Sequence, residues 1–168
     1  MDKRVVMIIA ILIVGIGCMY FIVDNSNTIG NAITTFSKTS VTLPSGFSVS
    51  ETNSESAELY NKQSNETIDI HDKGKGNHTE DIFKNVTETY NNNPEYSNLT
   101  EETKNVSNIE VFQLNMVTNN TTSSCSVFYH YNHTYLVEMS GFDNINEVNK
   151  NLEFIITTLQ PDYKQAQD

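Results

Sequence analysis

The sequence has no tryptophan and is short of positively charged residues and of cysteine, and the last two shortages each exclude a class of protein. Its 168 residues include ten Lys and Arg against 21 Asp and Glu, which gives a formal net charge of −11. Because phosphate recognition depends on clustered basic side chains, a nucleic-acid partner is excluded. The two cysteines, Cys18 and Cys125, are too few for a small fold stapled by disulfides. The length is that of one domain with an anchor or tail attached.

A long hydrophobic run lies near the start of the chain, over residues 5–23, and reads VVMIIAILIVGIGCMYFIV. None of these residues is charged. As a helix rising about 1.5 Å per residue, the run matches the thickness of a bilayer's hydrocarbon core. It therefore predicts a single transmembrane helix.

The charges on either side of this run predict its orientation. Lys3 and Arg4 precede it, whereas Asp24 follows it and the next basic residue is Lys38. By the positive-inside rule, residues 1–4 form a cytoplasmic tail and the chain after Asp24 lies outside the cell. That external part has eight lysines and twenty acidic residues, and its charge of −12 disfavours contact with an anionic bilayer. We therefore expect a single-pass protein of the cell membrane.

Two alternatives to an uncleaved anchor stay open. Residues 15–17 (GIG) have the small-x-small pattern of a signal-peptide cleavage site, although apolar residues continue after it. Cys18 follows the same residues and is the candidate for a lipid-modified cysteine, but the usual bulky aliphatic residue three positions before it is missing. Both alternatives also place the domain outside the cytoplasm.

Asn-x-Ser/Thr sequons agree with an external location. Such sequons are acceptors for N-glycosylation and mark exposed surface when they are modified. Eight of them follow the anchor, at Asn65, Asn77, Asn85, Asn98, Asn105, Asn119, Asn120 and Asn132.

After the anchor, the chain divides into a polar tether over 24–40, a compact domain over 41–160 and a polar tail over 161–168. The domain begins with a strand-like segment, SVTLPSGFSVSE, which is broken by a Pro-Ser-Gly turn. Alternating apolar and polar residues then predict strands at 57–61 and 66–71, joined as a hairpin, and at 109–117. The polar stretch 96–108 predicts one weak strand.

Two helices are predicted from apolar residues at helical spacing. The first starts at Asn77, with Glu80 at the capping-box position, and ends before Pro94. Its apolar face consists of Ile82, Phe83, Val86 and Tyr90. The second runs from Asn144 to Gln160 and is ended by Pro161. Its apolar stripe consists of Ile145, Val148, Leu152, Ile155, Ile156 and Leu159.

A hairpin is predicted over 125–131 and 134–139, around a two-residue turn at Asn132–His133. This register pairs Tyr129 with Leu136 and Phe128 with Val137. Apolar residues then lie on both sides of the hairpin, which predicts a sheet that is buried on both faces.

The order of these elements resembles a known family. The segment Leu43-Pro44-Ser45-Gly46-Phe47 is followed by a hairpin, a helix, antiparallel strands and a last helix that ends with Ile155-Ile156-Thr157-Thr158-Leu159. Over about residues 41–160 this is similar to the PsbP-type fold, which is shared with the Ran-binding Mog family and with small membrane-anchored or secreted bacterial proteins. The resemblance implies an α+β domain, an antiparallel sheet flanked by helices, that serves as a binding or assembly module. It carries over no functional residue.

The side chains that carry chemistry form few recognisable groups. His71, Asp72 and His78 surround the loop at 72–77 and are the candidates for a divalent-ion site, with solvated loop side chains as the simpler interpretation. His130 and His133 have an H-x-x-H spacing, but on a strand such residues point to opposite faces. Cys125 is interpreted as a buried free thiol.

The motifs of common enzymes are missing. The lysines and glycines at 73–76 lack the spacing of a P-loop, and no Gly-x-Ser-x-Gly elbow is present. We therefore expect no catalysis and no cofactor. The expected function is a non-catalytic binding or assembly module of the cell envelope, held by residues 5–23 and bound to another envelope protein. The alternative is a surface domain that binds a small ligand or a divalent ion.

Overall fold

The computed structural model describes residues 33–118 and 121–161. The predicted transmembrane segment 5–23 lies outside these ranges, and among the residues within them no helix is long and apolar enough to cross a bilayer. The strands are β1 (Ile33–Phe36), β2 (Thr39–Thr42), β3 (Ser48–Thr52), β4 (Ser56–Asn61), β5 (Glu66–Lys75), β6 (Ser97–Val106), β7 (Ile109–Thr118), β8 (Thr121–His130), β9 (His133–Phe142) and β10 (Gln160–Pro161). The helices are α2 (Thr79–Asn91) and α3 (Ile145–Thr158).

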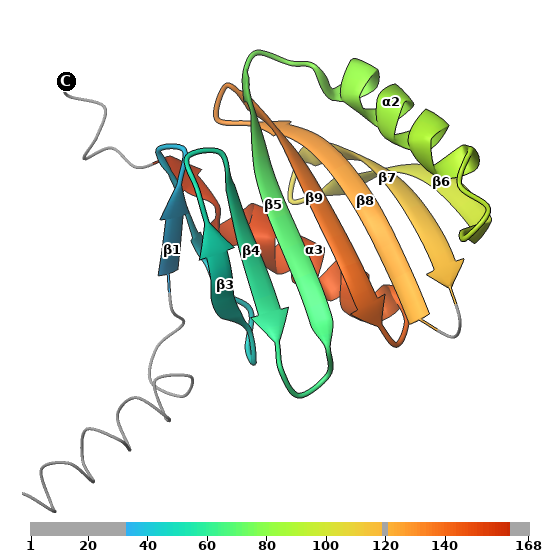
Figure 1. Ribbon diagram of the computed structural model, residues 1–168. Coiled ribbons are helices and arrows are strands. Elements are labelled where there is room, and N and C mark those ends of the chain that lie inside the picture. Colours follow the sequence, from blue (N-terminus) through green and yellow to red (C-terminus); the bar gives the residue numbers. More distant parts are fainter. Residues whose placement is uncertain (1–32, 119–120, 162–168) are drawn as a thin grey trace, which may run out of the picture.

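A seven-stranded antiparallel sheet forms the body of the fold, in the order β3-β4-β5-β9-β8-β7-β6. A smaller sheet, β1-β2-β10, lies beside its β3 edge (Figure 1). The helices α2 and α3 lie on opposite faces of the large sheet. The α+β class and the flanking helices that the PsbP-type resemblance implies are therefore present.

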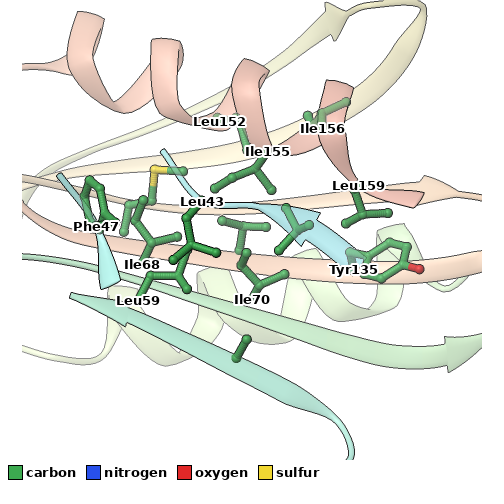
Figure 2. Packing of buried hydrophobic residues seen from close by; sticks show 14 of the residues in the cluster. Leu43, Phe47, Leu59, Ile68, Ile70, Tyr135, Leu152, Ile155, Ile156 and Leu159 are labelled. Carbon is green, nitrogen blue, oxygen red and sulfur yellow. The ribbon is translucent and has the colours of Figure 1, made fainter. Parts of the chain in front are cut away.

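The larger hydrophobic core lies between the sheet and α3 (Figure 2). Leu152, Ile155 and Ile156 of α3 are buried there against alternate residues of β4 and β5, such as Leu59 and Ile68. Strand residues two apart share a face, which is why the alternating pattern of the sequence puts one apolar set on this side. The predicted stripe on α3 is confirmed, and the Asn144 side chain caps the helix by accepting hydrogen bonds from the Asn146 and Glu147 amides.

A second, smaller core lies under α2. It contains Leu114, Met116, Cys125, Val127 and Leu136 of the sheet, packed against the predicted apolar face of the helix. The central strand β8 is buried over almost its whole length because the two cores meet at it. The expectation of a sheet buried on both faces is confirmed for this central part.

Several sequence expectations need correction. The last helix, predicted to reach Gln160, ends at Thr158, and Gln160 and Pro161 form β10. The predicted tether 24–40 includes β1 and the start of β2, so the fold begins no later than Ile33. The segment 96–108 contains the ten-residue strand β6, which is longer than the weak strand expected. The capping box of α2 is wrong, because the helix begins at Thr79 and Asn77 lies before the boundary, where its side chain accepts from the Thr79 amide.

The β8–β9 turn also differs from the prediction. Tyr131 and Asn132 form it, both with positive φ, and His130 pairs with His133. Phe128 therefore pairs with Tyr135, where Val137 was expected. This two-residue shift keeps every side chain on its predicted face, because the side-chain period of a strand is two. The apolar pattern alone does not distinguish the two registers.

We expect Leu152→Ala to lower the free energy of unfolding by about 3 kcal/mol, because the truncation leaves a cavity under α3. The neighbouring exposed residue offers a control: Glu153→Ala is expected to change it by less than about 0.5 kcal/mol. Urea unfolding of the full chain in detergent, followed by circular dichroism, measures both. Equal losses in the two variants would show that α3 does not pack as described.

Candidate functional site

The three candidate metal ligands from the sequence do not converge. His71 and Asp72 are adjacent on β5 and therefore point to opposite faces of the sheet. The His71 Nε2 atom lies 3.5 Å from Glu138 Oε2, whereas Asp72 contacts His133 on the other face. His78 Nε2 lies 3.1 Å from the carbonyl oxygen of Lys75. Within residues 33–118 and 121–161, no three His, Cys, Asp or Glu side chains are grouped to hold a metal ion.

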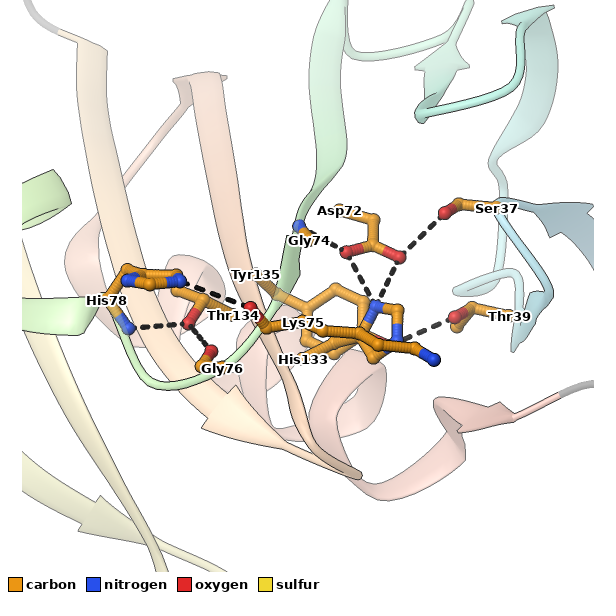
Figure 3. A network of polar contacts seen from close by, with 10 residues as sticks. All are labelled: Ser37, Thr39, Asp72, Gly74, Lys75, Gly76, His78, His133, Thr134 and Tyr135. Atoms are coloured by element: carbon orange, nitrogen blue, oxygen red, sulfur yellow. Dashed lines mark hydrogen bonds and ion pairs between the residues drawn. The ribbon is translucent and has the colours of Figure 1, made fainter.

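Asp72 is the centre of a buried polar network (Figure 3). Its carboxylate accepts hydrogen bonds from the Ser37 hydroxyl at 2.7 Å, the Gly74 amide at 2.8 Å and His133 Nδ1 at 2.8 Å. The Asp72 side chain is 1% exposed. Since a buried carboxylate is stable only when it is paired and hydrogen-bonded, these three donors explain how it is accommodated.

This network fastens the β1–β2 hairpin to the large sheet. Ser37 lies in the turn between β1 and β2, and the hydroxyls of Thr39 and Tyr135 share a second hydrogen bond of 3.0 Å between the same elements. The positive φ of Gly74 accompanies a shift of the β5–β9 register between Asp72 and Lys75. The Asp72–His133 pair has the form of a catalytic dyad, but Ser37 donates to the carboxylate and is not bonded to the imidazole. The network therefore joins the hairpin to the sheet without the serine-to-imidazole contact of a hydrolase triad.

A second polar cluster lies on the other face, at the edge of α2, and is centred on Glu138. Its Oε1 atom accepts hydrogen bonds from the Tyr90 hydroxyl at 3.1 Å and from the Cys125 thiol at 3.6 Å. Its Oε2 atom faces His71. The hydrogen bond from His71 is the main reason why the pKa of Glu138 is lowered, against the opposing effect of burial.

The surroundings of the thiol in this cluster do not favour a nucleophile. Burial, followed by the charge of Glu138, raises the pKa of Cys125 to about 12. A reactive cysteine needs a lowered pKa and a base that takes its proton, whereas here the carboxylate lies between the thiol and His71. Burial also raises the pKa of Tyr90. At neutral pH both groups are neutral donors to Glu138, and Cys125 is a free, buried cysteine, as the sequence predicts.

A small cavity of about 220 Å³ adjoins this cluster. Its lining includes Asp69, Tyr90, Tyr96, Ser123 and Glu138. The pKa of Asp69 is raised by burial and then by the charge of Glu58. The cavity therefore places a carboxyl group with a raised pKa beside two aromatic rings.

A larger groove of about 750 Å³ lies at one end of the domain. The segment between β2 and β3, the β4–β5 turn and the side of α3 enclose it. Phe47 and Phe154 provide apolar surface, and Glu66, Glu147 and Glu153 provide negative charge. The groove is the larger of the two sites and stands on regular secondary structure.

The sequon asparagines within the described ranges are all exposed, namely Asn65, Asn77, Asn85, Asn98, Asn105 and Asn132. Asn119 and Asn120 lie outside those ranges. Exposure is what modification requires. Glycosylation itself stays a prediction.

Sequence reasoning did not identify Glu138, Tyr90 or Tyr96 as site residues. Glu138 is the only charged residue in the predicted strand 134–139, and a single charge in an apolar strand is the pattern that could have identified it as a site residue. Its partners come from β5, β8 and α2, so their meeting depends on strand order and register.

Comparisons with known proteins find similarity in the fold alone. No family model matches the sequence, and no curated protein matches it. A crystal structure from Bacteroides thetaiotaomicron is similar with a TM-score of 0.52 and 16% identity, over 79% of this chain and 48% of that one. The chain thus spans about half the length of that protein. The solution structure of cyanobacterial PsbP (CyanoP) from Synechocystis is similar with a TM-score of 0.49 and 9% identity, over 74% of this chain and 87% of that one.

The likeness to the Bacteroides structure shows the fold alone, an α+β domain with antiparallel sheets and two helices. At such low identities no residue role follows from either structure, and nothing is argued from the second.

We expect Cys125 to react very slowly in the folded protein. At pH 8 a thiol with a pKa of about 12 is ionised to roughly one part in 10⁴, against about a quarter for an unperturbed cysteine. Alkylation by iodoacetamide in a Cys18→Ala background, which leaves one thiol, is therefore expected to be at least ~100-fold slower than in urea. Similar rates in the folded and unfolded states would contradict the burial of this thiol.

We expect Asp72→Asn to lower the free energy of unfolding by about 1–3 kcal/mol, because the amide cannot accept from all three donors. Asp143→Asn is the matched control, since Asp143 is exposed, and its effect is expected to be below about 0.5 kcal/mol. Urea unfolding at one pH compares them. An Asp72 variant as stable as the control would show that the network does not hold the hairpin.

Proposed function

We propose that this protein is a membrane-tethered, extracellular binding module of the cell envelope without catalytic activity. The observation that carries the proposal is the groove of about 750 Å³ along the side of α3. Binding sites are concave, and they combine apolar surface with a few polar groups that fix orientation. In this groove Phe47 and Phe154 supply the apolar surface, and the surrounding carboxylates supply the polar groups.

The position of the groove supports a partner in the same membrane. Ile33 pairs with Thr42, and Pro44 of the groove follows two residues later, so the chain enters β1 at the groove's end of the domain. Nine residues, 24–32, separate the predicted anchor from β1. Such a segment spans at most about 30 Å. An uncleaved anchor would thus keep the groove close to the membrane surface.

The charge around the groove indicates the chemistry of that partner. Glu66, Asp143, Glu147 and Glu153 line it, against Lys150 as the basic residue. A partner with a basic segment and an apolar side chain complements this surface, because opposite potentials favour association. The alternative, a surface domain that binds a small ligand or a divalent ion, stays a prediction.

We predict that a photo-crosslinking residue at position 157, in the groove, captures a membrane protein when the full chain is expressed in its native envelope. The same residue at position 131 is the control, because Tyr131 is exposed at the other end of the domain, in the β8–β9 turn. A crosslink from 157 that is lost on changing Glu147 and Glu153 to Lys is the expected result.

Deletion of residues 1–32 adds a second control, because a membrane-proximal partner is out of reach of an untethered domain. Equal crosslinks from both positions, or none from position 157 in the tethered chain, would contradict the proposal. Turnover of a substrate that is abolished by Cys125→Ala or His71→Ala would contradict its non-catalytic part.

A further inference from the structure

The strand β6 is one edge of the seven-stranded sheet (Figure 1). Within residues 33–118 and 121–161, no strand is paired with its outer side. It has ten residues, whereas β3, at the opposite edge, has five and a bulge in its middle. An edge strand presents a row of unpaired amide and carbonyl groups that another strand can join. The bulge of β6 lies at its start, between Ser97 and Thr100, so segment 100–106 is the regular part of this edge.

The helices leave the outer side of β6 accessible. The helix α2 packs on β7 and β8, and α3 packs on β2, β8 and β9. Most residues of segment 100–106 are exposed, namely Thr100, Glu101, Glu102, Thr103 and Asn105. A strand from another molecule can therefore approach this edge.

The turn between β6 and β7 decides which backbone groups of β6 point outward. It consists of two residues with positive φ, Ser107 and Asn108, so Val106 and Ile109 on either side form a hydrogen-bonded pair. Hydrogen-bonded and non-hydrogen-bonded pairs alternate along an antiparallel ladder. The amide and carbonyl groups of residues 101, 103 and 105 therefore point away from β7. If the joining strand is a second β6, its odd-numbered residues must lie opposite these.

The charges of the segment then select one register for two copies of β6. A two-fold axis at Thr103 places Glu102 of each copy opposite Lys104 of the other. An axis at Glu102 would oppose the two Glu102 side chains, and an axis at Lys104 would oppose the two lysines. Opposite charges in directly opposed pairs stabilise a sheet, and like charges destabilise it. Charge complementarity therefore favours the axis at Thr103.

The two charged side chains are already held on one face of this edge. Lys104 Nζ lies 3.3 Å from Glu102 Oε1 and 2.6 Å from Asn149 Oδ1 of α3. Asn115 Nδ2 donates to the same Glu102 oxygen at 3.2 Å. With the axis at Thr103, two glutamates and two lysines form a ring of alternating charge on the α3 face. The pairs of Glu102 with Lys104 are non-hydrogen-bonded pairs, in which side chains lie closest.

A lysine on an edge strand ordinarily opposes pairing with a further strand. Lys104 has this effect on most strands, but its charge is compensated by the Glu102 of a second copy. We propose that β6 pairs antiparallel with β6 of a second copy about a two-fold axis at Thr103, so that the two large sheets become continuous. Each copy contributes the same patch, as a closed dimer requires. The interface is separate from the groove and does not depend on the function proposed for it.

The predicted glycosylation site Asn105 is compatible with this pairing. Asn105 lies opposite Glu101 in the proposed register. Glu101 is paired with Leu114 of the core under α2, so both side chains are on the α2 face, away from the charged ring. Side chains stand roughly perpendicular to a sheet. A glycan at Asn105 would therefore leave the edge along the face and not along the line of the hydrogen bonds.

Sedimentation equilibrium of the full chain in density-matched detergent tests the dimer by charge reversal. Glu102→Lys and Lys104→Glu are each expected to weaken dimerisation at least ~10-fold, because two attractive pairs become repulsive. The double variant restores opposite charges and is expected to recover most of the loss. Glu55→Lys is the matched control, because Glu55 is exposed in the β3–β4 turn at the other edge, and it should leave the dimer unchanged.

A thiol crosslinker tests the register. In a Cys18→Ala background, where Cys125 is buried, Thr103→Cys places two thiols directly opposite each other. They are within reach of a bis-methanethiosulfonate reagent that spans about 5 Å. Thr100→Cys is the control, because Thr100 lies opposite Val106 and the two new thiols are then about 20 Å apart. We expect crosslinked dimer from Thr103→Cys and not from Thr100→Cys.

Several results would overturn the proposal. One is a chain that stays monomeric in detergent, which is also expected if β6 receives a strand from a different protein. Another is a dimer that all the charge variants leave unchanged, as association through segment 5–23 alone would give. A third is equal crosslinking from the two cysteine positions. Circular dichroism shows which variants are folded, and if the single reversals are not, the double variant and the crosslinks still decide.

Discussion

The burial of the central hairpin on both faces is the constraint on which the rest of the structure depends. In β8 and β9, residues on one face pack under α2 and those on the other under α3, so neither helix is dispensable. A sheet with two apolar faces is stable in water only when both are covered. Among the polar groups brought in with it, Glu138 finds partners in Tyr90, Cys125 and His71. The buried hydroxyls of Ser124 and Ser126 on β8 form no hydrogen bond with the described residues.

The helices α2 and α3 cover unequal areas of the two faces of the sheet. The core under α3 continues to β4 and β5 and to the β1–β2 hairpin, so that face is closed along its length. The core under α2 ends at β9, and the same face of β4 and β5 carries Glu58, Asp69 and His71. A boundary between covered and open sheet therefore runs beside β9. The small cavity lies at this boundary, where desolvation and carboxylate charge act on the same groups.

Local patterns were sufficient for the helices and most strands, because each depends on neighbours within a few residues. The stripe on α3 and its Asn144 cap are examples. The β8–β9 register was missed because two registers place the same side chains on the same faces. Residues 33–40 are predicted as part of the tether because the segment is mostly polar and has few large apolar residues. Its two strands are instead held by hydrogen bonds to residues distant in the sequence, Asp72 and Tyr135. The Glu138 cluster could not be predicted from the sequence for the same reason, because its members come together only through the order of the strands.

Asp69 and Asp72 show how one residue type serves two purposes on one strand. Three residues apart on β5, they point to opposite faces. Asp72 is enclosed and receives three hydrogen bonds, so its charge is fully compensated and its contribution is stability. Asp69 is paired with Glu58 and Glu138 on the neighbouring strands and receives no hydrogen bond from the described residues. Burial, and then the charge of Glu58, raise the pKa of Asp69, so its ionised form is disfavoured in the folded state. The same side-chain type therefore contributes stability where donors surround it and costs stability where like charges face it.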